Sequence, residues 1–278
     1  MRLIDAPGQE TNLPPRHDDV RVLKFGSSVL RSPRDLCEVA TEIYRFSRTG
    51  AKVVAVVSAF AGETDRLIGE ANRLAGGPGA RHFARYVALG EERASSALAL
   101  VCDAIGLDTE VLGSAELGIV AGGPVDDALP ESINLERLML AIGRRDAVIV
   151  PGFAAIGRDG HIVLLGRGGS DLTAVFLASV IGTPTATLVK DVDGVYECDP
   201  ALAGARARRY FSISWNDAAA IAGRLVQPKA IEFAQTRGTK ICIRRVGEDR
   251  ATMIGADSAP PAAHAAARPL RIAIAGLG

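Results

Sequence analysis

The stretch Gly166-Arg167-Gly168-Gly169-Ser170-Asp171 leads directly into an apolar segment at residues 172–181. It is typical of a glycine-rich turn that opens a helix. Glycines let the backbone approach a ligand closely, and free N–H groups at a helix N-terminus point toward bound anions. Arg167, Ser170 and Asp171 add a cation, a hydroxyl group and a carboxylate to the same turn. The stretch therefore predicts an anion-binding site at the start of a helix.

Two further polar clusters accompany this turn. One follows a short apolar run at residues 185–189 and reads Lys190-Asp191-Val192-Asp193-Gly194-Val195-Tyr196-Glu197-Cys198-Asp199-Pro200. The other lies far upstream and reads Val22-Leu23-Lys24-Phe25-Gly26-Ser27-Ser28. Together the three clusters indicate a site that binds a nucleotide and a small anionic substrate.

Apolar runs alternate with helical patterns along most of the chain. The runs that are typical of buried strands lie at residues 20–25, 53–57, 147–150, 185–189 and 240–244. Helical patterns follow the Ser32-Pro33 start signal and occupy residues 81–105, 131–143, 216–222 and 228–237. Arg158-Asp159-Gly160 is typical of a hairpin turn. The alternation predicts an α/β fold over residues 20–246, a three-layer α/β/α sandwich with a mainly parallel central sheet.

The composition limits the class of protein. The 278 residues are 48% apolar, and 32 basic residues balance 32 acidic ones. This balance argues against a nucleic-acid or membrane-surface protein. No apolar run reaches membrane-spanning length, and residues 1–19 read as a polar, mobile leader rather than a signal peptide. The four cysteines are scattered without a CxxC pair, which predicts reduced thiols in a cytoplasmic protein.

The composition changes near the C-terminal end. Residues 247–269 are rich in Ala and Pro, which predicts a linker. Residues 270–278 form an apolar run that ends in Gly-Leu-Gly, as at the start of a dinucleotide-binding βαβ unit. We expect these residues to be the truncated start of a second domain, although short glycine motifs also arise by chance.

Several separated motifs occur in the order found in aspartate kinases of the amino-acid kinase superfamily. They are Lys24-Phe25-Gly26, Ser58-Ala59, Gly90-Glu91, residues 166–171 and residues 191–196. The resemblance covers residues 20–246 and implies an amino-acid kinase-like fold, ATP and Mg²⁺ as cofactors, and a homodimer. The implied reaction is phosphorylation of the β-carboxylate of L-aspartate. Because residues 270–278 resemble the start of a homoserine dehydrogenase, the chain resembles the kinase half of a bifunctional aspartokinase–homoserine dehydrogenase without the intervening ACT domains.

The resemblance also implies a role for each motif residue. Lys24 would contact the transferring phosphate, Asp171 would orient this lysine, and Arg224 would complete the catalytic set. Arg167 would bind the α-carboxylate of aspartate, and Glu91 its ammonium group. The other substrate-binding residues would be Ser58, Ala59, Thr64, Phe153 and Ser170. The nucleotide would be bound by Gly26, Ser27, Ser28, Gly168, Gly169, Lys190, Asp191, Asp193, Gly194, Tyr196 and Lys229.

Three positions depart from the family pattern. Ser27 stands at the second glycine of the first motif, and Ala201 stands where the family has an arginine after Asp-Pro. Arg224 replaces a lysine that contacts phosphate, with Lys229 as a nearby substitute. Arginine keeps the charge but not the shape of lysine. The departures therefore concentrate at the nucleotide end of the site.

Other interpretations stay open. A kinase with the same fold could use a different acceptor, such as glutamate, another small carboxylate or a phosphonate. Arg224 and Ala201 favour a degenerate domain that binds nucleotide or amino acid and scaffolds or regulates an attached homoserine dehydrogenase. Single residues also have structural interpretations, such as a helix-capping ion pair between Arg167 and Asp171, or a solvated charge cluster at Glu91.

Overall fold

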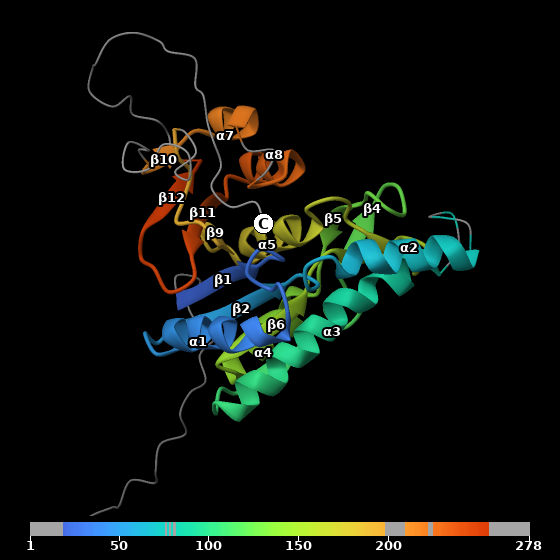
Figure 1. Cartoon of the computed structure of the whole chain (residues 1–278), viewed down its shortest axis with the longest axis horizontal. Coiled ribbons are helices and arrows are strands. Elements are labelled where there is room, and N and C mark those ends of the chain that lie inside the picture. Colours follow the sequence, from blue (N-terminus) through green and yellow to red (C-terminus); the bar gives the residue numbers. More distant parts are fainter. Residues whose placement is uncertain are drawn as a thin grey trace, which may run out of the picture.

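The computed structural model describes residues 19–75, 77, 79, 82–197, 209–221 and 225–255. Within these residues the main sheet has eight strands in the order β10-β12-β11-β9-β1-β2-β6-β3 (Figure 1). The strands are β1 (Val20–Phe25), β2 (Lys52–Val57), β3 (Thr109–Val111), β6 (Ala147–Pro151), β9 (Thr185–Lys190), β10 (Ser212–Ile213), β11 (Lys240–Arg245) and β12 (Ala251–Ile254). Neighbouring strands are parallel except for the antiparallel pair β11–β12. The predicted mainly parallel sheet is confirmed.

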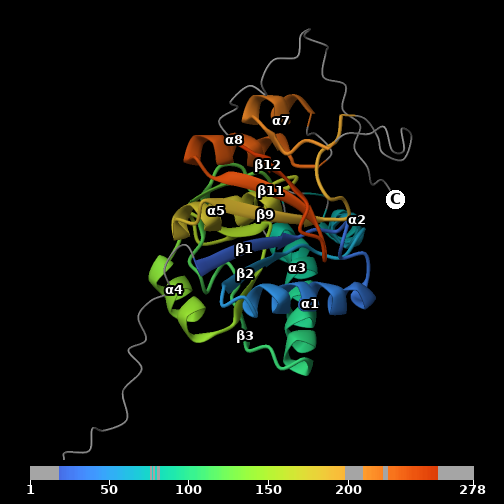
Figure 2. The same ribbon diagram turned by 90° about the vertical axis from the view of Figure 1, so that its left-hand side faces the viewer.

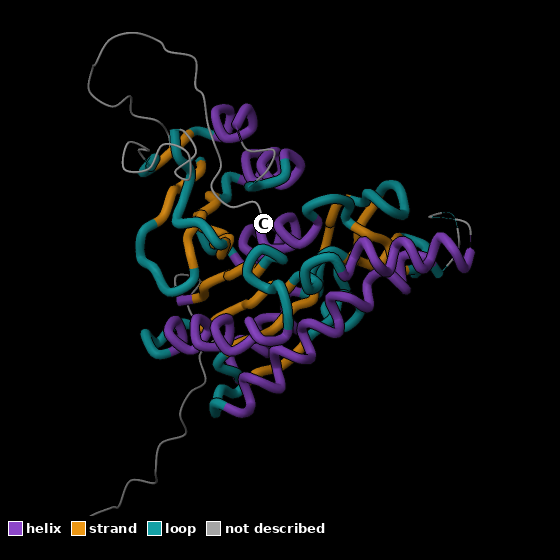
Figure 3. The backbone as a smooth tube through the Cα atoms, in the orientation of Figure 1, coloured by secondary structure: helices purple, strands orange, loops and turns teal. Residues whose placement is uncertain are grey.

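Helices cover both faces of this sheet (Figures 2 and 3). One face packs against α1 (Leu36–Ser47) and α3 (Phe83–Ala104), and the other against α4 (Leu135–Arg144), α5 (Gly169–Ile181) and α8 (Pro228–Arg237). In addition, α2 (Glu63–Ala75) packs on α3, and α7 (Trp215–Ile221) packs on α8. This arrangement is the predicted three-layer α/β/α sandwich. None of the described helices is both long and apolar enough to span a lipid bilayer.

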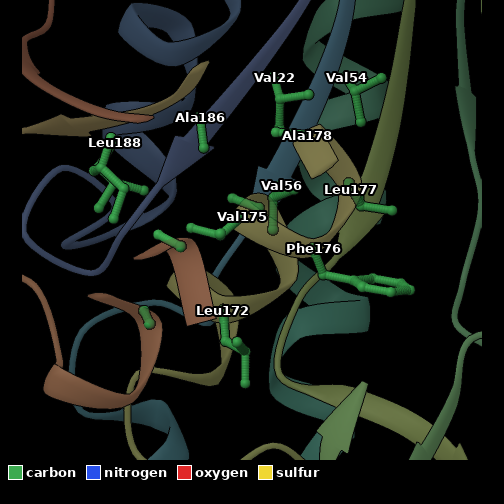
Figure 4. Close-up of a cluster of buried hydrophobic side chains, with 14 of the residues drawn as sticks. Val22, Val54, Val56, Leu172, Val175, Phe176, Leu177, Ala178, Ala186 and Leu188 are labelled. Carbon is green, nitrogen blue, oxygen red and sulfur yellow. The ribbon is translucent and has the colours of Figure 1, made fainter. Parts of the chain in front are cut away.

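The helix that follows the glycine-rich turn lies at the centre of one layer. Side chains alternate across β2, so that Val54 and Val56 face α5 while Ala55 faces α1 and α3. Every residue of α5 from Gly169 to Ala178 is buried, as expected for a helix that is apolar on all sides (Figure 4). Packing on all sides therefore fixes the start of α5 relative to the sheet.

A second, four-stranded sheet was not predicted. Its order is β5-β4-β7-β8, with β4 (Val120–Gly122), β5 (Leu129–Ser132), β7 (Ala154–Gly157) and β8 (Ile162–Leu164). The predicted turn at residues 158–160 connects the antiparallel hairpin β7–β8. The prediction of a helix from residue 131 was wrong by four residues, because residues 129–132 pair with β4 instead. Asn134 starts the helix by accepting a 3.0 Å hydrogen bond from the Arg137 backbone.

The predicted start of the linker at residue 247 was also wrong. Strand β12 pairs with β11 and belongs to the main sheet, so the domain continues to Ile254. A buried carboxylate on α1 holds this hairpin. Glu42 accepts hydrogen bonds from Arg45 Nη1 at 2.8 Å and from the Gly247 backbone N–H at 3.1 Å, and it lies 3.3 Å from Arg244 Nη2. The remaining linker residues, from 256, and the predicted start of a dehydrogenase at residues 270–278 lie outside the described residues, as does the predicted leader up to residue 18.

The Glu42 cluster gives a stability prediction. Glu42→Gln should lower the free energy of unfolding by about 3 kcal/mol, because it removes the buried counter-charge of the largely buried Arg244 and leaves it only the exposed carboxylate of Asp249. Urea unfolding of the variant and the wild type measures this difference. Glu38→Gln, an exposed change one turn earlier on α1, is the control and should change stability little. Equal stabilities for Glu42→Gln and the wild type would contradict the structural role of the cluster.

Candidate active site

Three parallel strands end side by side at one edge of the main sheet. Phe25, at the end of β1, pairs with Val57 of β2 and with Val189 of β9. Ser58, which follows β2, and Lys190, the last residue of β9, therefore lie at this carboxyl edge. Ligands of open α/β sheets bind in the crevice outside the carboxyl ends of the strands. The topology places the three sequence clusters where such a site is expected.

Two lysines converge on one carboxylate at this edge. Lys24 Nζ lies 2.6 Å from Asp171 Oδ1, and Lys190 Nζ lies 3.5 Å from Asp171 Oδ2. Lys24 shares the face of β1 that carries Val22, and this face packs against α5, whose first turn holds Asp171. A Cβ atom on Gly26 would lie 2.7 Å from Lys24 Nζ, so only glycine leaves room for the lysine head group. The predicted pairing of Lys24 with Asp171 is present, and the alternative pair of Arg167 with Asp171 is not among the ion pairs of Asp171.

Burial changes the ionisation of these groups. Burial acts to raise the pKa of Asp171, but Lys190 and Lys24 outweigh it and hold that pKa below its ordinary value. Burial also lowers the pKa of Lys190 to about 8, although Asp171 opposes this shift. With both lysines charged, the group carries one net positive charge in a poorly solvated place. Such an arrangement attracts an anion.

A cavity of about 500 Å³ adjoins this charged group. Its walls include all seven residues predicted to bind substrate, which are Ser58, Ala59, Thr64, Glu91, Phe153, Arg167 and Ser170. Lys24, Ser27, Gly168 and Gly169 also line it. The first turn of α5 thus forms part of the wall, where its free N–H groups suit an anion.

Glu91 and Arg167 present an acidic and a basic group to the cavity. Glu91 is 5% exposed, and its Oε2 atom has no hydrogen-bond partner. Burial raises the pKa of Glu91 to about 8, although Lys24 and a hydrogen bond from the Ala59 backbone oppose the shift. Arg167 is exposed, and among the described residues no carboxylate forms an ion pair with it. The buried Glu91 therefore does not belong to a solvated charge cluster, and both groups remain available to a ligand.

Close packing holds the substrate side of the cavity in place. Ser58 Oγ and Ser170 Oγ share a 2.7 Å hydrogen bond between β2 and α5. A Cβ atom on Gly152 would lie 2.6 Å from the Ser170 Cβ atom, so glycine is required at the end of β6. The next residue, Phe153, has a φ of 65°, a left-handed conformation that is uncommon for a bulky side chain. Such strain is found where surrounding structure enforces a functional geometry.

Four of the residues predicted for the nucleotide, Asp191, Asp193, Gly194 and Tyr196, follow Lys190 in the chain. Tyr196 donates a 2.6 Å hydrogen bond to Asp193 Oδ1, and Arg250 Nε lies 3.5 Å from Asp193 Oδ2. Gly194 has a φ of 144° and lies against Arg209, whose side chain a Cβ atom would meet. None of Asp191, Asp193, Gly194 and Tyr196 lines the 500 Å³ cavity. Their contact with a nucleotide stays a prediction.

Three other predicted residues have different positions. Lys229 donates hydrogen bonds to Asp127 Oδ1 and to the carbonyl oxygens of Ala128 and Leu165, so a phosphate contact requires these bonds to open. Ser28 lies in the turn after β1, and its buried Oγ atom has no hydrogen-bond partner. Arg224 lies outside the described residues.

The sequence interpretation missed several cavity walls. Apolar side chains contribute much of the surface, and two carboxylates stand among them. The lining residues that were not predicted are Phe60, Gly62, Asp65, Ile68, Phe83, Asp126, Leu164 and Gly166. Apart from Gly166, which the glycine-rich turn contains, they come from helix starts and short strands whose meeting depends on the tertiary fold.

The chain is similar in sequence to aspartokinases. The chain is 30% identical over 226 residues to an aspartokinase of Helicobacter pylori strain J99, an alignment that covers 80% of this chain and 56% of the relative. It is 32% identical over 216 residues to an aspartate kinase of Stutzerimonas stutzeri, with 77% and 52% covered. The chain thus spans about half the length of these curated relatives.

Solved structures show the same fold. The crystal structure of aspartate kinase from Synechocystis matches with a TM-score of 0.72 and 26% identity, covering 85% of this chain and 40% of the other. The fold of Escherichia coli aspartokinase III in complex with aspartate and ADP matches with a TM-score of 0.74 at 18% identity, covering 86% and 65%. The model of the amino acid kinase family matches residues 19–245, which include every strand of the main sheet up to β11. The chain therefore belongs to the amino acid kinase family.

Proposed function

We propose that this domain transfers the γ-phosphoryl group of ATP to the β-carboxylate of L-aspartate. The proposal rests on a guanidinium group and a buried carboxyl group that line one cavity, neither of which forms an ion pair with another described side chain. Arg167 offers a fork of donors that matches a carboxylate, and Glu91 offers a buried carboxylate that matches an ammonium group. A zwitterionic amino acid satisfies both. The aspartate kinases among the relatives support this choice of acceptor.

The charged group at Asp171 suits the phosphoryl transfer itself. Charge spreads over the transferred phosphoryl group in the transition state, so positioned cations and N–H groups lower the barrier. Lys24 lines the cavity beside the turn at the start of α5, and Asp171 fixes the position of its ammonium group. The acceptor carboxylate is already ionised near neutral pH, so the reaction needs no general base to activate it.

The residues at this edge fit a Mg²⁺ ion that accompanies ATP. Magnesium usually keeps several waters and binds to substrate phosphates with only one or two protein carboxylates. Among the described residues no group of three His, Cys, Asp or Glu side chains forms a metal-binding cluster. Asp191 and Asp193, which follow Lys190 in the sequence, would be the protein ligands of Mg²⁺, and an ion held by Asp193 would replace the contacts of this carboxylate with Tyr196 and Arg250. Bound there, the ion would neutralise charge on the phosphates.

Proton release on aspartate binding tests the role of Glu91. With its pKa near 8, Glu91 is mostly protonated at pH 7 in the free protein, and an ammonium partner would ionise it. Aspartate binding at pH 7 should therefore release about one proton, and the release should fall as the pH rises above 8. Calorimetry in two buffers with different ionisation enthalpies measures it.

Two variants make this test specific. Glu91→Gln should bind aspartate weakly and release no proton, whereas Glu92→Gln, at the neighbouring exposed carboxylate, should behave like the wild type. Binding of aspartate to the wild type without proton release would contradict the assignment of Glu91 to the ammonium group.

A degenerate domain is the second candidate function. Arg224 in place of the family lysine and the engagement of Lys229 by Asp127 favour it, because both concern the nucleotide end of the site. Such a domain would bind ATP or aspartate without forming a product, and it would scaffold or regulate an attached dehydrogenase. The presence of Lys24, Asp171, Glu91, Arg167 and Ser170 around one cavity supports catalysis instead.

We also infer the assembly and location from the resemblance to aspartate kinases. That resemblance supports a cytoplasmic homodimer, and the free thiols of Cys37, Cys102 and Cys242 agree with a reducing compartment. Fusion to a homoserine dehydrogenase rests on the motif at residues 270–278 alone. Light scattering of the purified chain tests the homodimer.

A further inference from the structure

A second cavity lies outside the candidate active site. It has a volume of about 330 Å³, and it is formed by the start of α3, the β7–β8 hairpin and Ala115. Its lining residues are His82, Arg85, Ala115, Ile156, Gly160, His161 and Ile162. Sites for small organic molecules start at about this volume.

Basic side chains dominate the polar lining of this cavity. His82 and Arg85 come from the start of α3, and His161 comes from the hairpin. Among the described residues, Arg85 forms no ion pair and neither imidazole ring forms a hydrogen bond. The two acidic residues nearest in sequence are engaged elsewhere: Asp159 accepts a 3.1 Å hydrogen bond from the His161 backbone, and Glu116 accepts one of 2.8 Å from the Gly113 backbone. The cavity therefore offers three unengaged basic side chains and no carboxylate in its lining.

The helix adds to this positive potential. The first turn of α3 holds no acidic residue, and His82 at the N-cap makes no side-chain capping hydrogen bond. The positive end of a helix dipole is thus left uncompensated by side chains beside Arg85. The three basic side chains are the main groups that would attract an anion, and the N-terminal end of α3 adds to this attraction.

Part of the lining is apolar. Ile156 of β7 and Ile162 of β8 are cross-strand partners, and both are half-buried. A ligand that filled the cavity would place an apolar body against the two isoleucines. Because no carboxylate lines the cavity, an ammonium group would find no partner, and amino acids are disfavoured as ligands.

We propose that this cavity binds a small organic anion that carries a phosphate or carboxylate group on a short aliphatic body. The oxyanion would lie between Arg85, His82 and His161, and the aliphatic part would contact Ile156 and Ile162. The site is separate from the candidate active site, since Phe83 and Leu164 from the same two elements line that other cavity instead. The proposal does not depend on kinase activity.

Histidine resonances of the full chain test the proposal directly. The chain has four histidines, so their ring proton signals can be followed individually by NMR. Propyl phosphate and butanoate are the two probes, which distinguish a phosphate from a carboxylate head group. At least one of them should shift the signals of His82 and His161 in a saturable manner. Assignment uses His82→Gln and His161→Gln.

Three arginine variants locate the bound probe. Arg85→Gln should weaken binding by about tenfold, the effect of a lost charge-assisted hydrogen bond. Arg144→Gln, at an exposed arginine of α4, should leave the affinity unchanged. Arg167→Gln should also leave it unchanged, because that residue lines the other cavity. The proposal is overturned if neither probe shifts the two histidine signals saturably, or if Arg167→Gln abolishes the shifts while Arg85→Gln does not.

Discussion

Lys24→Met should lower kcat for aspartate phosphorylation by about 10³-fold, the scale of losing one positioned cation from a phosphoryl-transfer site. The KM for aspartate should change little, since Arg167 and Glu91 bind that substrate in our account. The variant should remain as stable as the wild type. Removing Lys24 leaves Lys190 and Asp171 as a neutral buried pair, so no unpaired charge is created.

Steady-state kinetics and thermal unfolding of the purified chain measure these effects. Lys240→Met is the matched control, because Lys240 is an exposed lysine at the start of β11, away from the carboxyl edge. It should keep its kcat within about twofold of the wild type, within the scatter expected for a remote surface change. A Lys24→Met enzyme with a kcat within tenfold of the wild type would rule out direct contact with the transferred phosphate.

Asp171→Asn should reduce both activity and stability. The variant leaves two lysines buried together without a counter-charge, which should lower the free energy of unfolding by about 3 kcal/mol near pH 7. It also frees the Lys24 ammonium group, so kcat should fall by about 10²-fold or more. Lys24→Met should lose activity but not stability. The contrast between the two variants separates the role of Lys24 in phosphoryl transfer from the role of Asp171 as the counter-charge of both lysines.

The stability loss of Asp171→Asn should depend on pH. The pKa of Lys190 in the folded protein is about 8, below its ordinary value of 10.5, so between these values the unfolded chain binds more protons and wild-type stability rises with pH. Above pH 8 Lys190 loses its charge, so it no longer requires the negative charge of Asp171 to compensate its burial. The difference between wild type and variant should therefore shrink from pH 7 to 9.5.

Urea unfolding at the two pH values measures this change. Asp103→Asn, at an exposed carboxylate near the end of α3, serves as the control and should show no such trend. A stability difference that stays constant or grows with pH would contradict the assigned charge of the Lys190–Asp171 pair.

Local signals in the sequence were enough to predict the five longest strands of the central sheet and the helices that cover it. The apolar run at β1 and the proline that opens α8 gave the bounds of both elements, Val20–Phe25 and Pro228–Arg237. The prediction succeeds here because buried parallel strands are continuously apolar and helix ends carry capping signals.

Short edge strands escaped prediction for the opposite reason. β4 and β5 have three and four residues, and much of their surface is exposed, so neither has a long apolar pattern. Their pairing is decided by distant partners rather than by local sequence. β12 was not predicted because the polar residues 247–250 precede it and resemble a linker. These residues form the turn between β11 and β12, and the buried Glu42 of α1 holds that turn. The helix α2, at Glu63–Ala75, was also missed, because its charged residues obscure a narrow apolar face.

In the candidate site too, features set by local sequence were predicted and features set by the tertiary fold were not. Turn motifs gave the residues that now meet around Lys24 and Asp171, because the motifs at residues 22–28 and 190–200 lie where β1 and β9 end at one edge, and the motif at residues 166–171 opens α5 beside them. The ionisation of Glu91 and the apolar walls at Phe60 and Phe83 depend on burial, which arises only when α2, α3 and the small sheet come together.

Trapping of the acyl phosphate product shows whether the chain phosphorylates aspartate. The purified chain is incubated with ATP, Mg²⁺ and L-aspartate, and hydroxylamine traps any acyl phosphate as a hydroxamate. Our account predicts a hydroxamate that requires ATP and aspartate, is absent with glutamate as acceptor, and is lost in Lys24→Met. Calorimetric binding of both ATP and aspartate without hydroxamate would contradict catalysis and favour the degenerate domain, and hydroxamate with glutamate alone would contradict the assigned acceptor.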